Sequence, residues 1–162
     1  MRPSKSVSAS RTIISLQMLP SDANPMGNVH GGTILKLMDV SAAVAAMRHS
    51  RTNVVSASID RMDFYHPVYV GNLLMLKASV NYSGRTSVEV GVRIEAEDLK
   101  TGKVAHTGSS YITYVALDDE GKPTQVPELV PHTAVEKKRW REAKQRRAQR
   151  LQLLKRQAKN SK

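Results

Sequence analysis

The apolar positions of residues 31–47 predict a long helix that is buried on almost every side. They are Ile34, Leu35, Leu37, Met38, Val40, Ala42, Ala43, Val44, Ala46 and Met47. A helix that is apolar all round lies inside a domain rather than on its surface. The basic residues in "RHSRTN", which follow, are favoured near a helix C-terminus by the helix dipole. We therefore expect a core helix that begins at Gly31.

Around this helix, apolar and polar residues alternate with the period of two that is typical of β-strands. The predicted strands are 11–19, 53–67, 73–83, 86–99 and 104–118, with a loop over 20–30 and a hairpin turn over 98–103. In the strand after the helix, the alternation places Val55, Ala57 and Ile59 opposite Val54, Ser56 and Ser58. Short connections favour an antiparallel meander of the last four strands. The order predicts an α+β domain, a curved antiparallel sheet wrapped around one long buried helix.

The length of 162 residues suits one domain with a single core, and the absence of cysteine excludes disulfides and cysteine-ligated metals. No apolar run approaches the ~20 residues that a membrane span needs. The N-terminus, "MRPSKSVSASRT", is basic and serine-rich and lacks the apolar segment of a secretory signal. A cytoplasmic protein without a membrane span is therefore expected.

The net charge of +11 comes entirely from the C-terminal tail. Residues 1–136 contain 13 basic and 13 acidic residues, whereas residues 137–162 contain 12 basic residues and one acid, Glu142. The tail has helix-forming composition and sparse apolar residues, so it predicts a basic helix that docks through Trp140 and its leucines or stays solvated. Trp140 is its only aromatic residue, and single-stranded nucleic acid binding needs several stacking aromatics. Nucleic acid is therefore an unlikely partner.

The segment "SDANPMGNVHGGTILKLMD", residues 21–39, carries the candidate chemistry. A helix that begins at Gly31-Gly32 exposes unpaired N–H groups that a carbonyl or an oxyanion can approach closely. Asp39 lies on the same apolar helix, where an unpaired carboxylate is costly, and it suits general-base or nucleophilic catalysis. Asn24 is a neutral group that suits orienting water or a carbonyl.

Seven residues separate Gly32 from Asp39, about 10 Å along one helix. This distance is too long for an oxyanion donor and a base that act on one carbonyl. Either the two residues serve different purposes, or Asn24 and the glycines of one chain work with Asp39 of another. The second alternative predicts a two-fold dimer with two interfacial sites. The five histidines form no ligand-spaced cluster, so no metal and no cofactor is expected.

Three stretches together resemble the hotdog-fold acyl-CoA thioesterases, in particular the cytosolic acyl-CoA hydrolases: "DANPMGNVHGGTILKLMD", "VVSASIDRMDFYHPVYVGN" and "GRTSVEV". The resemblance covers roughly residues 11–141. It implies hydrolysis of acyl-CoA to free acid and CoA, with CoA as part of the substrate and no separate cofactor. It also implies homodimers with sheets joined edge to edge, and a trimer of dimers. The predicted organisation is a flexible N-terminus (1–10), a hotdog domain (11–131) and a basic C-terminal helix (132–162).

The resemblance implies a role for particular residues. Asp39 matches the catalytic carboxylate, Asn24 the loop asparagine, and Gly31 and Gly32 the oxyanion-side glycines. The positions that match CoA contacts are Ala57, Ser58, Ile59, Thr86, Ser87, Val88 and Arg139. Arg85 is added because its charge and its place in a loop suit a phosphate.

Three other interpretations stay open. A non-catalytic acyl-CoA sensor would keep the CoA contacts without needing Asp39 and Asn24 together. A hotdog dehydratase relies on a histidine paired with an acid, and His30 has no obvious acid partner. An RNA-associated protein would use the basic tail. The sequence leaves open the acyl chain length, and the choice between water activation and an anhydride intermediate.

Overall fold

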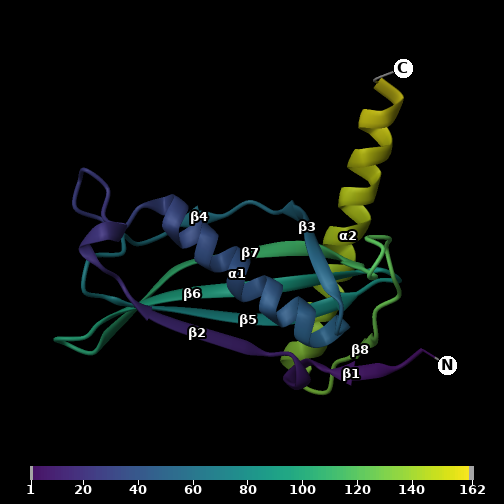
Figure 1. Ribbon diagram of the computed structural model, residues 1–162, viewed down its shortest axis with the longest axis horizontal. Helices are drawn as coiled ribbons and strands as arrows, with labels where there is room; N and C mark the ends of the chain where they lie inside the picture. Colours follow the sequence, from purple (N-terminus) through teal and green to yellow (C-terminus); the bar gives the residue numbers. More distant parts are fainter. Residues whose placement is uncertain (1, 161–162) are drawn as a thin grey trace.

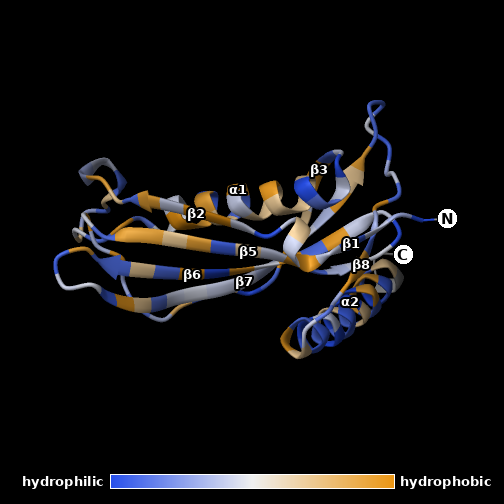
Figure 2. Ribbon diagram, turned by 90° about the horizontal axis from the view of Figure 1, so that it is seen from below, coloured by the Kyte–Doolittle hydropathy of each residue, from blue (hydrophilic) through white to orange (hydrophobic). Residues whose placement is uncertain are grey.

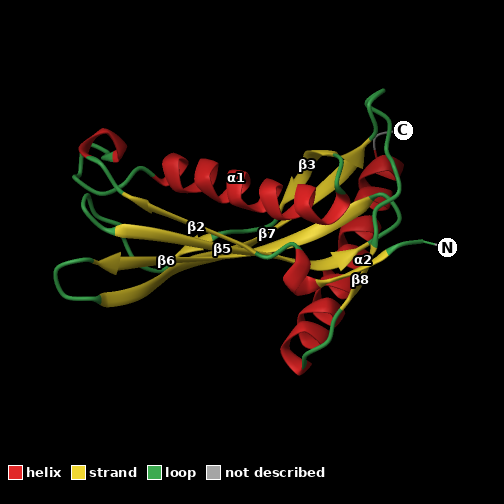
Figure 3. Cartoon of the chain, turned by 60° about the horizontal axis from the view of Figure 1, so that its bottom comes forward, coloured by secondary structure: helices red, strands yellow, loops and turns green. Residues whose placement is uncertain are grey.

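The structure is a computed structural model that describes residues 2–160 (Figure 1). A long helix, α1, lies on one face of a six-stranded antiparallel sheet, and a second helix, α2, lies on the other face (Figures 2 and 3). The helices are α1 (Gly31–Ser50) and α2 (Ala134–Asn160), with the 3-10 turns η1 (Val7–Ala9) and η2 (Pro20–Asp22). The strands of the large sheet are β2 (Thr12–Gln17), β3 (Asn53–Ile59), β4 (Asp63–Phe64), β5 (Leu73–Ser83), β6 (Ser87–Asp98) and β7 (Lys103–Leu117). Two short strands, β1 (Ser4–Ser6) and β8 (Glu128–Val130), pair in parallel beside it.

The core lies between α1 and the inner face of the sheet, as the alternating strands predict. The predicted burial of α1 on almost every side is not seen in the single chain, because Leu35, Val40, Val44 and Met47 on its outer side are 37% to 44% exposed. Met38, Ala42 and Ala45 of α1 are completely buried. The alternate positions Val88, Val90, Val92 and Ile94 of β6 face them and are at most 2% exposed. The small alanine side chains let the helix approach the sheet closely. One long helix packed on a curved antiparallel sheet confirms the predicted α+β class.

The predicted meander is wrong for one strand. The order across the sheet is β2-β5-β6-β7-β3, so β5, β6 and β7 form a meander while β3 pairs with β7 at the far edge. The connection from β3 to β5 spans residues 60–72 and contains Pro67. It is too long for a tight hairpin. This connection lets the chain cross from the β3 edge of the sheet to β5, which lies next to the opposite edge strand, β2.

The predicted alternation along residues 53–67 also breaks. The register shifts by one residue between Ser56 and Ser58, which makes Ala57 the extra residue of a β-bulge. Ser56 pairs with Tyr114 on the inner face, whereas Ser58 pairs with Thr113 on the outer face. The bulge therefore places Val55 and Ser58 on the same face, instead of on opposite faces.

The segments outside the predicted hotdog domain are structured over the described residues. In residues 2–10, expected to be flexible, β1 pairs with β8, and Val7 and Ser10 are at most 4% exposed. In residues 132–160, α2 packs on the outer face of the sheet through Trp140, whose ring lies 5.6 Å from that of Tyr82 in β5, and through the completely buried Ala143. Residues 1, 161 and 162, which the predicted segments include, lie outside the described part.

Candidate active site

The start of α1 leaves one backbone donor free. His30 is the N-cap, and its Nδ1 accepts a hydrogen bond from the Gly32 N–H at 3.0 Å. The Gly31 N–H has no acceptor within residues 2–160. Of the two predicted oxyanion donors, the Gly31 amide is therefore available. The Gly32 amide could donate to a substrate only after its hydrogen bond to His30 breaks.

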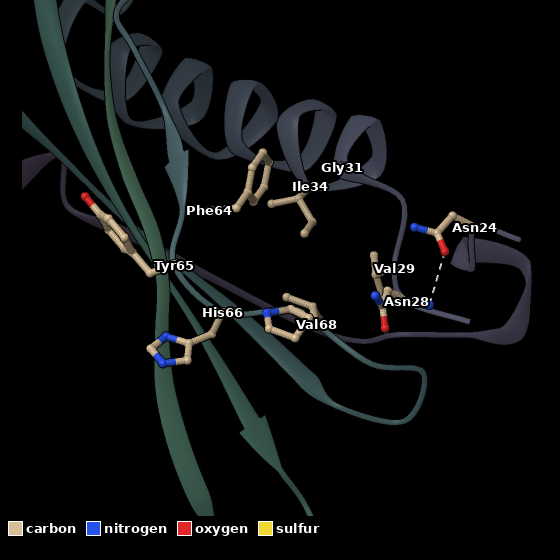
Figure 4. Close-up of a pocket in the computed structure, with 10 residues that line it drawn as sticks. Asn24, Asn28, Val29, Gly31, Ile34, Phe64, Tyr65, His66 and Val68 are labelled. Carbon is tan, nitrogen blue, oxygen red and sulfur yellow. Dashed lines mark hydrogen bonds between the residues drawn. The ribbon is translucent and has the colours of Figure 1, made fainter. Parts of the chain in front are cut away.

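Asn24 lies in the loop before α1 with its two amide atoms in different environments. Its Oδ1 accepts hydrogen bonds from the N–H groups of Met26 at 2.9 Å and Asn28 at 3.2 Å. This turn fixes the orientation of the side chain, because only an oxygen can accept two backbone N–H groups. Nδ2 is left as a donor, and it points toward the Gly31 end of the helix (Figure 4).

Asn24 and Gly31 line the same cavity of about 300 Å³ at the helix start (Figure 4). The other walls come from residues before the helix, its first turn and the segment after β3: Asn28, Val29, Ile34, Phe64, Tyr65, His66, Pro67 and Val68. The cavity thus combines two N–H donors with walls that are partly apolar, which suits a carbonyl group attached to an apolar chain. Asp39 is not among its lining residues.

Asp39 is half-buried and is held by a tyrosine that the sequence did not reveal. The hydroxyl of Tyr114 in β7 donates to Asp39 Oδ1 at 2.7 Å and to the Asp39 carbonyl at 2.9 Å. Burial, and then the hydrogen bond and charge of Asp39, raise the pKa of Tyr114 far above its usual value. Tyr114 therefore stays a proton donor, and Asp39 Oδ2 is the oxygen left for chemistry.

A second polar group that sequence reasoning missed lies near this pair. Ser56 pairs with Tyr114 across β3 and β7, so both side chains lie on the sheet face that carries α1. Ser56 is exposed at the open edge of the sheet. The sequence signal for both residues was ordinary strand alternation, which does not distinguish a site residue from a core residue.

The predicted CoA contacts fall into two groups. Four of them line one cavity of about 480 Å³ between α2 and the outer face of the sheet: Ala57, Ser58, Ser87 and Val88. The others do not line this cavity. Ile59 lies on the inner face beyond the bulge, and Arg85 and Thr86 lie in the turn between β5 and β6. Arg139 lines a smaller cavity of about 130 Å³.

Helix α2 supplies other arginines to the 480 Å³ cavity. Arg150 and the neighbouring Arg146 bind Glu89, which is 2% exposed, at 3.2 and 2.6 Å. Arg150 also binds Asp60 at 3.0 Å. Arg147 lines the same cavity and pairs with no carboxylate in the described part of the chain. This guanidinium is therefore available to an anion.

Residues 2–160 provide neither a metal-binding cluster nor a membrane-spanning helix. Those residues contain no group of three histidine, cysteine or acidic side chains that could hold a metal ion. Neither of the described helices combines the length and the apolar character needed to cross a bilayer.

The comparisons with known proteins agree with one another. A sequence model of the thioesterase superfamily matches residues 26–103. An acyl-CoA thioester hydrolase of Bacillus subtilis, YkhA, described as uncharacterized, is 35% identical over 127 residues, which cover 78% of this chain and 74% of the relative.

Two solved structures match almost the whole chain. An apo-hexameric acyl-CoA thioesterase has a TM-score of 0.90 and 41% identity, and the match covers 94% of this chain and 97% of that one. An acyl-CoA hydrolase of Staphylococcus aureus, solved with butyryl-CoA, CoA and CoA disulfide, has a TM-score of 0.86 and 38% identity, covering 99% and 100%.

Proposed function

The chain belongs to the thioesterase superfamily, and we propose from this membership and from the geometry of the site that it hydrolyses the thioester of acyl-CoA to free acid and CoA. The observation that carries the proposal is the likeness, over nearly the full length, to an acyl-CoA hydrolase solved with CoA. The site proposed for this reaction combines two N–H donors of one chain with the Asp39 carboxylate of a second chain.

In the proposed site, the thioester carbonyl accepts hydrogen bonds from the Gly31 N–H and from Asn24 Nδ2. Both donors line the 300 Å³ cavity, and neither is needed elsewhere in the fold. Preorganised donors of this kind stabilise the oxyanion of the tetrahedral intermediate. Gly32 serves this donor pair indirectly, because its bond to His30 caps the helix.

Asp39 attacks from a second subunit in this proposal. Asp39 lies eight residues after Gly31, which is about 12 Å along α1. It does not line the cavity of its own chain. Tyr114 holds Oδ1, so Oδ2 either removes a proton from a water molecule that attacks the carbonyl carbon, or attacks that carbon itself. In both cases the C–S bond breaks and the CoA thiolate leaves without a strong general acid. In the second case the product is an acyl anhydride of Asp39, which water then hydrolyses to the free acid and the restored carboxylate.

The dimer that completes the site uses the open edge of the sheet. Strand β3 has a neighbour on one side only, and Val55 and Ile59 on it are 47% and 53% exposed. The outer side of α1 is also apolar, with Leu35, Val40, Val44 and Met47 each between 37% and 44% exposed. Antiparallel pairing of two β3 strands about a two-fold axis would cover both surfaces. Three such dimers would form a hexamer.

The CoA portion of the substrate lies in the 480 Å³ cavity, where Arg147 meets a phosphate. Support comes from the four predicted CoA contacts in its wall and from the lack of a carboxylate partner for Arg147. Arg139 and Arg85 remain proposed phosphate contacts, although neither lines this cavity. We also propose a cytoplasmic location, as the sequence predicts.

The test is thiol release from acyl-CoAs of short to long chains by wild type and by Asp39→Asn. Wild-type turnover that falls at least about 1,000-fold in Asp39→Asn, with the dimer intact, would support the proposal. Normal turnover by Asp39→Asn would refute the role of Asp39. An absence of wild-type turnover on every acyl-CoA, with CoA still bound, would indicate the acyl-CoA sensor instead.

A further inference from the structure

Helix α2 crosses the outer face of the sheet and continues past its edge (Figure 1). Trp140 packs on Tyr82 in β5, an inner strand of the sheet. Further along α2, Arg150 binds Asp60, the residue that directly follows the edge strand β3. Because the strand order is β5-β6-β7-β3, the helix reaches the edge at Arg150. Residues 151–158 therefore begin at the last strand of their own sheet, where Leu151 and Leu154 line a cavity with Ala57 and Ser58 of β3, and continue outward from it.

This projecting segment carries apolar side chains that its own chain leaves uncovered. Leu151, Leu153 and Leu154 are 42%, 56% and 60% exposed. They line the open side of the 480 Å³ cavity together with Ala57 and Ser58 of the edge strand. Three leucines in a basic segment that is otherwise polar form the kind of exposed patch that marks an interaction surface.

We propose that residues 151–158, which we call the α2 strap, pack on the outer sheet face of the second subunit in the dimer. The inference rests on the proposed function, because it uses the two-fold pairing of β3 strands. That pairing continues the sheet beneath the strap. From Leu151 to Ala158 the helix rises about 10 Å, which spans about two strands at 4.8 Å spacing. The strap is therefore long enough to cover the nearest strands of the second sheet.

The direction of the leucines favours a second copy of this chain over other occupants. They share the cavity-facing side of α2 with Arg147 and Arg150, which face the sheet. A continued sheet already lies in that plane, and Val55 is exposed on its outer face beside the edge. Two-fold symmetry makes the contact reciprocal, so each strap covers the other subunit.

The first experiment measures dimer dissociation by sedimentation of dilute, fluorescently labelled protein. The test variant is the double substitution Leu151→Asp and Leu154→Asp. The matched control is Gln152→Asp, which adds a carboxylate on the opposite side of the same turn. We expect the dissociation constant to rise at least about 100-fold in the test variant and less than about 3-fold in the control. Equal dissociation constants in the two variants would overturn the proposal.

A second measurement uses the wild-type chain and does not depend on how a variant folds. In the dimer, the amides of the strap should exchange with deuterium at least about 100-fold more slowly than in an unstructured peptide, and they should lose this protection on dilution to monomers. Exchange of the strap amides at nearly the unstructured rate in the dimer would contradict the proposal.

Neither readout depends on turnover, so the two proposals fail separately. A protected strap in a protein that hydrolyses no acyl-CoA would leave the strap standing and refute the enzyme. Normal hydrolysis by a dimer whose strap is unprotected would refute the strap alone. A wild type that stays monomeric at every concentration would refute the strap together with the interfacial site.

Discussion

Replacing Tyr114 with phenylalanine tests how Asp39 is prepared for catalysis. The ring of Tyr114 is 2% exposed and would be retained, so the change removes little besides the hydroxyl. The single proton of that hydroxyl is shared between two acceptors of Asp39, Oδ1 at 2.7 Å and the carbonyl at 2.9 Å. A hydrogen bond to a charged group contributes about 1.5–3 kcal/mol. If that energy holds the carboxylate in its reactive position, kcat should fall about 10- to 100-fold.

The assay is thiol release, with kcat and KM measured separately for Tyr114→Phe and for Tyr111→Phe. Tyr111 lies on the same strand but on the outer face, where its ring packs under Arg146. Tyr111→Phe removes the same hydroxyl group from a tyrosine that does not contact Asp39. We expect a lower kcat with a nearly unchanged KM for Tyr114→Phe, and near-wild-type kinetics for Tyr111→Phe. A kcat for Tyr114→Phe within about 2-fold of wild type would refute the reasoning.

The raised pKa of Tyr114 gives this variant a second signature in alkaline solution. An unfolded tyrosine loses its proton above about pH 10, whereas the folded Tyr114 keeps it, so the unfolded state binds fewer protons there. Stability from this residue is complete below pH 10 and decreases above it, by up to about 1.4 kcal/mol per pH unit. Tyr114→Phe lacks this loss. The difference in unfolding free energy between wild type and variant should therefore narrow above pH 10, and a constant difference would contradict the assignment.

Three further changes probe other parts of the molecule. Asn24→Asp keeps the Oδ1 that accepts hydrogen bonds from the Met26 and Asn28 amides but removes the Nδ2 donor. We expect kcat to fall about 100-fold while the melting temperature changes little. A kcat equal to that of wild type would exclude Asn24 as an oxyanion donor. Arg147→Gln should raise KM for acyl-CoA about 5- to 10-fold but leave KM unchanged for an acyl thioester without phosphates. An equal change in KM for both substrates would rule out a phosphate contact. Burial lowers the pKa of His49, so the unfolded state binds more protons below about pH 6.5, and stability should decrease as the pH falls through that value. Urea unfolding from pH 5 to 7 should show this slope in wild type and not in His49→Gln.

The local features of this protein were predictable from its sequence. The apolar run after Gly31 predicts a core helix, and the structure places α1 there from Gly31 to Ser50. The alternation in residues 73–118 predicts three strands that form a meander, because each hairpin joins segments close in the chain. These features depend on side-chain periodicity and turn chemistry, which a single chain segment contains.

The contacts between distant segments were decided by the tertiary structure. Strand β3 lies at the edge beside β7 and carries a bulge at Ala57, because the long connection after it crosses the sheet. The same packing brings Tyr114 to Asp39, which is 75 residues away in the chain.

The basic tail shows the same division. Its composition predicts a helix, but only the fold shows that this helix crosses the outer sheet face and pairs its arginines with Glu89 and Asp60. Propensity and periodicity act over a few residues, whereas strand order and ion pairing depend on how the whole chain packs around its core. The sequence by itself therefore determined the long helices, most of the long strands and the candidate residues Asn24, Gly31 and Asp39. The tertiary structure decided which groups surround those residues, formed the short pair β1 and β8, and divided the predicted strand 53–67 into β3 and β4.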